Sequence, residues 1–178
     1  MAEAGWRDRG WRGGLFFLIA IFVVVADQIT KHWVRANIAV GDSLPEVGFV
    51  RIAHVQNTGS AFGLFTGQTV LLAIVAVIGI VVILMFYRYL SAYSMLGTVA
   101  LGMVFGGAVG NQIDRISRGH VTDFILVRLW GDVYWPTFNV ADSAITVGVI
   151  VLVCFIFWVL KKEDNRPAKS GSQVTPRH

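Results

Sequence analysis

Four apolar segments limit what this chain can fold into, because each approaches the roughly 20 residues that an α-helix needs to cross a bilayer. The segments at 69–87 and 141–160 reach that length without interruption. Those at 15–26 and 95–110 reach it only if their polar ends are included. With 55% hydrophobic residues, the composition is also too apolar for an ordinary soluble domain. We therefore predict an all-α polytopic membrane protein with transmembrane helices at about 14–34, 69–88, 95–113 and 140–160.

The first apolar segment has a second interpretation as a cleaved secretory signal peptide, since it follows Arg7, Arg9 and Arg12. No small-residue cleavage site comes after it, and the next residues, "ADQITKHW", carry an acid and a base instead. We therefore favour a retained span. Residues 1–162 are expected to form a single integral membrane domain, and the polar tail at 163–178 is expected to be disordered.

The basic residues predict how the chain is oriented in the membrane. Four spans place both termini on one side, together with most of the basic residues near the spans: Arg7, Arg9, Arg12, Arg88, Lys161, Lys162, Arg166, Lys169 and Arg177. The loops on the opposite side, 35–68 and 111–140, are longer and contain fewer basic residues. The positive-inside rule then places both termini in the cytoplasm and both long loops on the outer side.

The two outer loops contain short strand patterns. Residues 49–56, "FVRIAHVQ", mix β-branched and polar side chains with partial alternation. The runs "ILVRLW" and "VYWPTF" flank Gly131-Asp132, a pair suited to a two-residue hairpin turn, with Pro136 confined to an edge. We therefore expect a small β platform on the outer side, with an apolar and aromatic face lying on the membrane surface.

Two acids, Asp123 and Asp142, lie in apolar surroundings nineteen positions apart. Carboxylates near hydrocarbon are costly and usually mark function. Asp142 alone has a structural explanation, because Asn139 can cap the fourth helix and a helix dipole favours an acid in the first turn. Asp123 follows a turn at Gly119 and precedes an apolar strand, where no cap is needed. Two close carboxylates share a proton and suit aspartyl hydrolysis, but sequence spacing does not establish that these two are close.

Other polar residues have both structural and functional interpretations. Glycine recurs every fourth residue from 102 to 110, which helix packing explains fully. Asn111, Asp114 and Arg115 end the third span and are suited to holding a substrate backbone. Asp114 and Arg115 are equally suited to pairing with each other or with Asp123.

The first half of the chain offers three further candidates. Asn57 is explained equally well as a turn residue. Ser60 invites interpretation as a nucleophile, but the sequence places no His or Lys to activate it. Asp27 and Lys31 are four apart and are most simply an ion pair on one helix face.

Metal and disulfide chemistry are not indicated. His32, His54 and His120 show no metal-ligand spacing, so a metalloprotease is disfavoured. Cys154 is the single cysteine and lies inside an apolar run, where it cannot form an internal disulfide.

Taken together, four motifs resemble the bacterial lipoprotein signal peptidases, also called signal peptidase II. They are "DQITK", "QNTGSAF", "GGAVGNQIDR" with "GHVTDF", and "FNVADSAITVG". They occur in the family's order and cover all but the first dozen residues and the tail. Ser60 stands where the family usually has Ala, a small change that leaves the assignment intact.

The resemblance implies a membrane-embedded aspartic endopeptidase of the bacterial cytoplasmic (inner) membrane, with its active site near the outer face. It would cleave the signal peptide from diacylglyceryl-modified prolipoproteins immediately before the lipidated cysteine. The family's catalytic aspartates fall on Asp123 and Asp142, without an assignment of acid and base. Its supporting residues fall on Asn57, Asn111, Arg115, Asn139, Asp114, Asp27 and Lys31. The expected partners are these substrates and membrane lipids, with no nucleic acid, no metal and no cofactor, and the protein is expected to be a monomer.

Two other function classes remain open on the sequence. A small proton-coupled transporter or channel subunit would relay protons through its intramembrane acids. It needs a polar path across the bilayer, whereas every candidate acid here lies toward one side. A non-catalytic assembly factor docking through the glycine-rich third span would tolerate loss of both acids.

Overall fold

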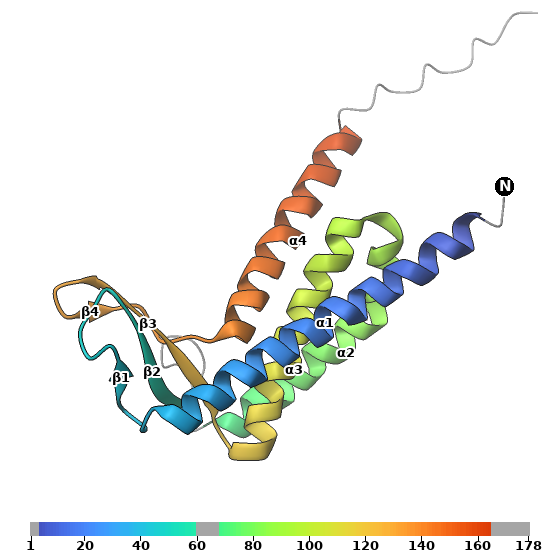
Figure 1. The fold of residues 1–178 in the computed structure, drawn as a ribbon. Coiled ribbons are helices and arrows are strands. Elements are labelled where there is room, and N and C mark those ends of the chain that lie inside the picture. The colour runs from blue at the N-terminus through green and yellow to red at the C-terminus, as the bar shows by residue number, and fades with distance from the viewer. Residues whose placement is uncertain (1–3, 60–67, 165–178) are drawn as a thin grey trace, which may run out of the picture.

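Helices make up most of the computed structural model, which describes residues 4–59 and 68–164. Four helices are present in this part of the chain: α1 (Ala4–Asn37), α2 (Thr69–Tyr93), α3 (Met95–Arg118) and α4 (Val140–Asp164). Each contains a stretch long and apolar enough to cross a membrane: Trp11–Asn37, Thr69–Tyr87, Met95–Arg118 and Val140–Lys162. Figure 1 shows the strands gathered at one end of the helices, while α1 begins and α4 ends at the opposite end. The predicted fold class is confirmed.

α3 is the helix on which the others pack, because it contacts α1, α2 and α4. In its most apolar window 56% of the residues are buried, against 0% in that of α2. Glycine permits the close approach to α1. A Cβ added at Gly106 would lie 2.6 Å from the carbonyl oxygen of Ala20, closer than real Cβ contacts come. The packing interpretation of the glycine repeat is therefore confirmed.

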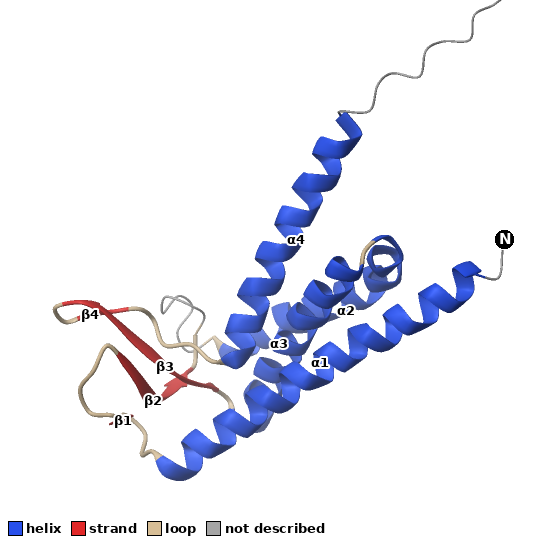
Figure 2. Cartoon of the chain, turned by 45° about the horizontal axis from the view of Figure 1, so that its top comes forward, coloured by secondary structure: helices blue, strands red, loops and turns tan. Residues whose placement is uncertain are grey.

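An antiparallel sheet lies beside one end of the helices (Figure 2). Its strands, in spatial order, are β1 (Ser43–Leu44), β2 (Val50–Asn57), β3 (Val121–Trp130) and β4 (Val133–Tyr134). β3 begins directly after α3, because Gly119 ends that helix in the left-handed conformation with φ +76°. Antiparallel pairing then sets Asn57 opposite Val121. The sheet therefore brings the end of β2 alongside the part of β3 that carries Asp123.

The edge of the platform is shorter than the sequence pattern suggested. β4 ends at Tyr134, whereas "VYWPTF" predicted strand character through Phe138. Pro136 lacks an N–H for a ladder hydrogen bond, and Phe138 forms only an isolated bridge with Ile125. The short strand β1 carried no sequence signal and was not predicted.

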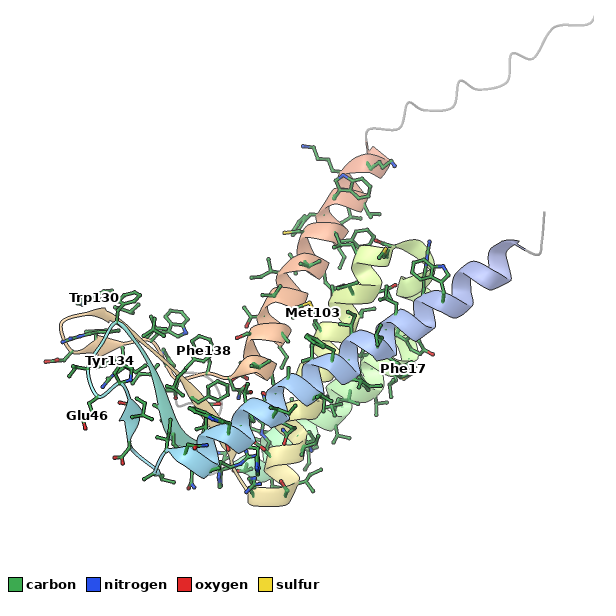
Figure 3. All side chains as sticks on the ribbon, viewed as in Figure 1. Phe17, Glu46, Met103, Trp130, Tyr134 and Phe138 are labelled. Atoms are coloured by element: carbon green, nitrogen blue, oxygen red, sulfur yellow. The ribbon has the colours of Figure 1, made fainter. Side chains whose placement is uncertain are left out.

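Apolar side chains cover much of the outside of the molecule (Figure 3). Phe17 on α1 is 43% exposed, Met85 on α2 is 70% exposed and Trp130 at the end of β3 is 69% exposed. An apolar surface of this extent marks contact with other apolar material, and a bilayer supplies it for helices of spanning length. By contrast, the charged Asp27 and Lys31 side chains of α1 are fully buried.

Candidate active site

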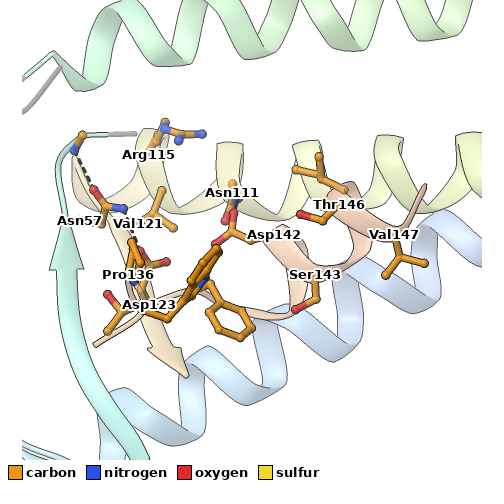
Figure 4. A pocket seen from close by; sticks show the side chains of 15 residues that line it. Asn57, Asn111, Arg115, Val121, Asp123, Pro136, Asp142, Ser143, Thr146 and Val147 are labelled. Carbon is orange, nitrogen blue, oxygen red and sulfur yellow. Dashed lines mark hydrogen bonds between the residues drawn. The ribbon is translucent and has the colours of Figure 1, made fainter. Parts of the chain in front are cut away.

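A pocket of about 650 Å³ opens where the end of α3, the start of α4 and the start of β3 meet (Figure 4). Asp123 and Asp142 both line it, so the fold brings the two acids to one cavity. Much of the remaining wall is apolar: Val121, Trp135, Pro136, Phe138, Ile145 and Val147. An apolar wall strengthens the interaction between charges, because it keeps the local dielectric low.

Asp123 is the more enclosed of the two acids. It lies near the start of β3 and is 1% exposed. Its Oδ2 accepts a hydrogen bond from Asn57 Nδ2 at 2.8 Å, and its Oδ1 accepts one from Asn139 Nδ2 at 2.7 Å. Burial and the nearby Asp142 carboxylate raise the pKa of Asp123 to about 7, against the opposing effect of the two amide donors. A carboxyl group with this pKa exchanges its proton near neutral pH.

Asp142 lies in the first turn of α4, where it forms a capping box with Asn139. Asn139 Oδ1 accepts a hydrogen bond from the Asp142 backbone N–H at 2.9 Å. Asp142 Oδ2 accepts one in return from the Asn139 backbone N–H at 3.2 Å. The cap predicted at Asn139 is confirmed. The other oxygen, Oδ1, accepts from Asn111 Nδ2 at 2.7 Å, which ties the acid to α3.

Asn139 connects the two acids to each other. Besides capping α4, its Nδ2 lies 2.7 Å from Asp123 Oδ1 and 3.1 Å from Asn111 Oδ1. Asn139 is fully buried, so water does not compete for these hydrogen bonds. The positions of Asp123 and Asp142 therefore depend on one shared side chain as well as on their separate strands and helices.

A buried ionic cluster of Asp27, Lys31 and Asp114 contacts this amide network through Asn111. Lys31 Nζ donates to Asn111 Oδ1 at 2.9 Å and lies 2.8 Å from Asp27 Oδ2 and 3.4 Å from Asp114 Oδ2. The predicted Asp27–Lys31 ion pair is confirmed. Asp27 Oδ1 also accepts from the backbone N–H of Ala141 at 3.0 Å, so α1 holds the first turn of α4 directly.

Asp114 does not pair with Arg115 or Asp123, the partners considered from the sequence. Its Oδ2 accepts from the Thr122 backbone N–H at 2.9 Å, and its Oδ1 lies 3.4 Å from Arg35 Nη1. The helix turn explains the difference, because consecutive residues on α3 point to different sides. Asp114 therefore fixes the start of β3, one residue before Asp123.

Arg115 reaches the pocket from α3 and lies on the side of that helix facing α2 (Figure 4). The charges of Asp142 and Asp123 both act on it. Among the described residues, none accepts a hydrogen bond from its guanidinium group. The guanidinium group of Arg115, which carries five N–H donors, thus lines the pocket beside the two acids.

A serine nucleophile and a metal site were the other chemistries considered from the sequence. Ser60 lies outside the described residues. Within residues 4–59 and 68–164, no three His, Cys, Asp or Glu side chains are grouped as metal ligands would be.

A family model described as signal peptidase (SPase) II matches residues 19–158 of this chain. This match includes all of α2 and α3, most of α1 and α4, and every candidate site residue named above. The chain belongs to the signal peptidase II family.

Curated relatives agree with the family assignment. The chain is 44% identical over 146 residues to a lipoprotein signal peptidase of Dehalococcoides mccartyi, covering 80% of this chain and 88% of that protein. It is 36% identical over 157 residues to the enzyme of the same name from Staphylococcus aureus, covering 88% and 94%.

Solved structures share the fold. One bacterial membrane enzyme superposes with a TM-score of 0.78 at 33% identity, covering 88% of this chain and 95% of that chain. A second gives 0.71 at 35% identity, covering 80% and 92%. Membership of the signal peptidase II family makes the protein a membrane protease, and the transporter interpretation is not supported.

Two residues near the signal peptidase II site escaped the sequence analysis. Arg35 Nη1 donates to Thr122 Oγ1 at 3.1 Å, next to its contact with Asp114. Its position offered a signal, since Arg35 follows Lys31 by four residues and therefore shares its helix face. Thr122 offered none, because its backbone N–H and its Oγ1 contact Asp114 and Arg35, which lie on two different helices.

Proposed function

We propose that this protein is a membrane-embedded aspartic endopeptidase that removes the signal peptide from diacylglyceryl-modified prolipoproteins, cutting immediately before the lipidated cysteine. The main observation behind it is that Asp123 and Asp142 line one pocket and are joined through Asn139. Family membership and the names of the curated relatives support the choice of substrate.

The chemistry follows from one proton shared by two carboxyl groups. With the pKa of Asp123 at about 7, the pair carries a single proton over much of the neutral range. The ionised carboxylate takes a proton from a water molecule, whose oxygen attacks the scissile carbonyl carbon. The protonated carboxyl gives its proton to the carbonyl oxygen. When the C–N bond breaks, the carboxyl that took the proton from water gives it to the leaving amine of the lipidated cysteine, and the other carboxylate takes a proton from a hydroxyl of the intermediate as the new carboxyl group forms.

The supporting residues act by positioning. Asn57, Asn111 and Asn139 hold the carboxylates through amide donors, while Arg115, which lines the pocket, donates to carbonyl oxygens of the substrate backbone. Asp27, Lys31 and Asp114 hold the start of α4 and of β3 in place. Such fixed geometry matters because small displacements of reacting groups are costly in rate.

The distribution of charge supports an outward-facing site. Lys161 and Lys162 lie in the last turn of α4, at the end away from the sheet. The positive-inside rule then places both termini in the cytoplasm and the site near the outer face of the bacterial cytoplasmic membrane. We further propose that residues 1–162 act as one domain, as a monomer surrounded by membrane lipid.

Substitution of each acid tests the proposal. Asp123→Asn and Asp142→Asn should remain folded in the membrane and lose at least roughly a thousandfold in the cleavage rate of a purified diacylglyceryl-modified precursor. Asp132→Asn is the matched control, because the Asp132 side chain is 99% exposed and lies outside the pocket. Near-normal cleavage by either of the first two variants would refute the two-carboxylate assignment. Equal cleavage of unlipidated precursor by the unsubstituted protein would refute the substrate class.

A further inference from the structure

A second cavity, of about 560 Å³, lies between α2 and α3. This α2/α3 groove is lined by the first part of α2 and the last turns of α3, including Thr69, Ala73, Val77, Gln112, Arg115 and Ile116. Most of its wall is aliphatic, and its size falls in the roughly 300–1,000 Å³ range of ligand pockets. It lies at the end of the helices that carries the acid pocket, since α2 starts and α3 ends there (Figure 1).

Gln112 is a buried polar side chain in a wall that is otherwise mostly aliphatic. It is 8% exposed, and its buried Oε1 accepts no hydrogen bond from any described residue. Its Nε2 likewise donates to none of the described residues. The Nε2 amide is therefore available to donate to a ligand that supplies a hydrogen-bond acceptor within the groove.

The groove adjoins the candidate active site at Arg115. Arg115 lines both cavities, so its side chain forms part of their common wall. Gln112 follows Asn111, which holds Asp142, but the helix turn directs it toward α2 instead of α4. A substrate with its scissile bond at the acids can therefore place a second group in the groove by passing Arg115.

We propose that the α2/α3 groove binds one acyl chain of the diacylglyceryl group on the substrate cysteine, and that the amide of Gln112 donates to the ester carbonyl of that chain. This inference rests on the proposed function. The chemistry of the groove matches such a chain, which is a long hydrocarbon with a carbonyl acceptor at its head. A peptide helix matches less well, because its backbone carbonyls are already bonded within the helix. A bulk phospholipid would have no reason to lie beside the acids.

The proposal is tested by removing the amide and the carbonyl separately. Two precursors are compared, one with ester-linked acyl chains and one with ether-linked chains that lack both carbonyls. The full-length protein should cleave the ester precursor with a several-fold lower KM, roughly the effect of one hydrogen bond. Gln112→Leu should lose this preference with little change in kcat. Ile116→Leu, which changes only an aliphatic side chain in the same groove, should keep it.

The possible outcomes distinguish the acyl-chain proposal from the proposed peptidase function. The same ester-to-ether ratio in Gln112→Leu and in the unsubstituted protein would overturn the role of Gln112 while leaving the peptidase assignment standing. Failure of the unsubstituted protein to cleave either precursor would overturn the proposed function itself. A precursor carrying a photoreactive group within its acyl chain should label residues 69–78 of α2. Labelling confined to α1 or to the second half of α4 would overturn the choice of groove even if the ester preference is found.

Discussion

Removal of the amide donor at Asn57 should shift the alkaline limit of activity to higher pH. In the proposed mechanism one carboxyl of the pair must keep a proton, so activity falls when both acids are ionised. The second ionisation is expected near pH 7, because the pKa of Asp123 is about 7. Asn57 Nδ2 donates to Asp123 Oδ2 at 2.8 Å and stabilises the ionised form. In Asn57→Ala this stabilisation is lost, and the pKa of Asp123 rises further.

The size of the shift follows from the strength of that contact. A hydrogen bond to a charged group contributes about 1.5–3 kcal/mol, and one pKa unit corresponds to about 1.36 kcal/mol. The alkaline limb should therefore move up by roughly one to two pH units. The assay is the pH dependence of kcat/KM for a diacylglyceryl-modified precursor between about pH 5 and 10. The height of the profile will also fall if Asn57 contacts substrate, but the position of the limb is independent of its height.

Two further variants make this test decisive. Asn57→Asp keeps the acceptor that Asn57 Oδ1 offers to the Gly59 backbone N–H but adds a negative charge, so its limb should move at least as far. Gln56→Ala changes the exposed neighbouring residue of β2 and should leave the limb where it is. An unmoved limb in Asn57→Ala, or a shift toward lower pH, would refute the account of how Asp123 is held.

Three further predictions concern stability and metal dependence. The pKa of Asp123 is raised from 3.8 to about 7 on folding, so its burial costs nothing below about pH 4 and up to roughly 4 kcal/mol as the pH rises to 7. Asp123→Asn should therefore raise the thermal midpoint relative to the unsubstituted protein more at pH 8 than at pH 5, and equal changes at both would contradict this. Lys31→Met leaves Asp27 and Asp114 buried without their cation and should lower the free energy of unfolding by about 3–5 kcal/mol, whereas Lys162→Met at the exposed end of α4 should not. Metal chelators should leave the cleavage rate within about twofold, and loss of activity that Zn²⁺ restores would contradict a reaction carried by the two acids.

The helices could be predicted from the sequence because a helix that crosses a bilayer needs about 20 consecutive, mostly apolar residues. The sheet was harder to predict. The run after Gly131 reads as a strand through Phe138, but a single Pro136 is enough to end β4 at Tyr134. β1 is two residues long and exists only because β2 offers it a partner, so nothing local could reveal it.

The polar network shows where local patterns stop being informative. The Asp27–Lys31 pair lies four residues apart on one helix and was predicted correctly. For Asp114 the sequence left open pairing with Arg115, pairing with Asp123 or contact with substrate, whereas the structure shows it bonded to the backbone N–H of Thr122 across the turn at Gly119. Spacing alone could not place Asp123 beside Asp142, because that approach depends on where α3 ends and α4 begins. The family resemblance, unlike spacing, led to both acids.

Asp142 shows that the structural and functional interpretations of one residue need not compete. In the capping box it accepts a backbone N–H of Asn139, and the N-terminus of α4 favours a negative charge at this position. Asp123 is enclosed in β3, and its pKa is raised to about 7. Two carboxyl groups at one pocket thus lie in different surroundings, one enclosed in a strand and one at the start of a helix. The cap therefore supports the proposed mechanism, because the contacts that start the helix also hold the Asp142 carboxyl group in place at the pocket.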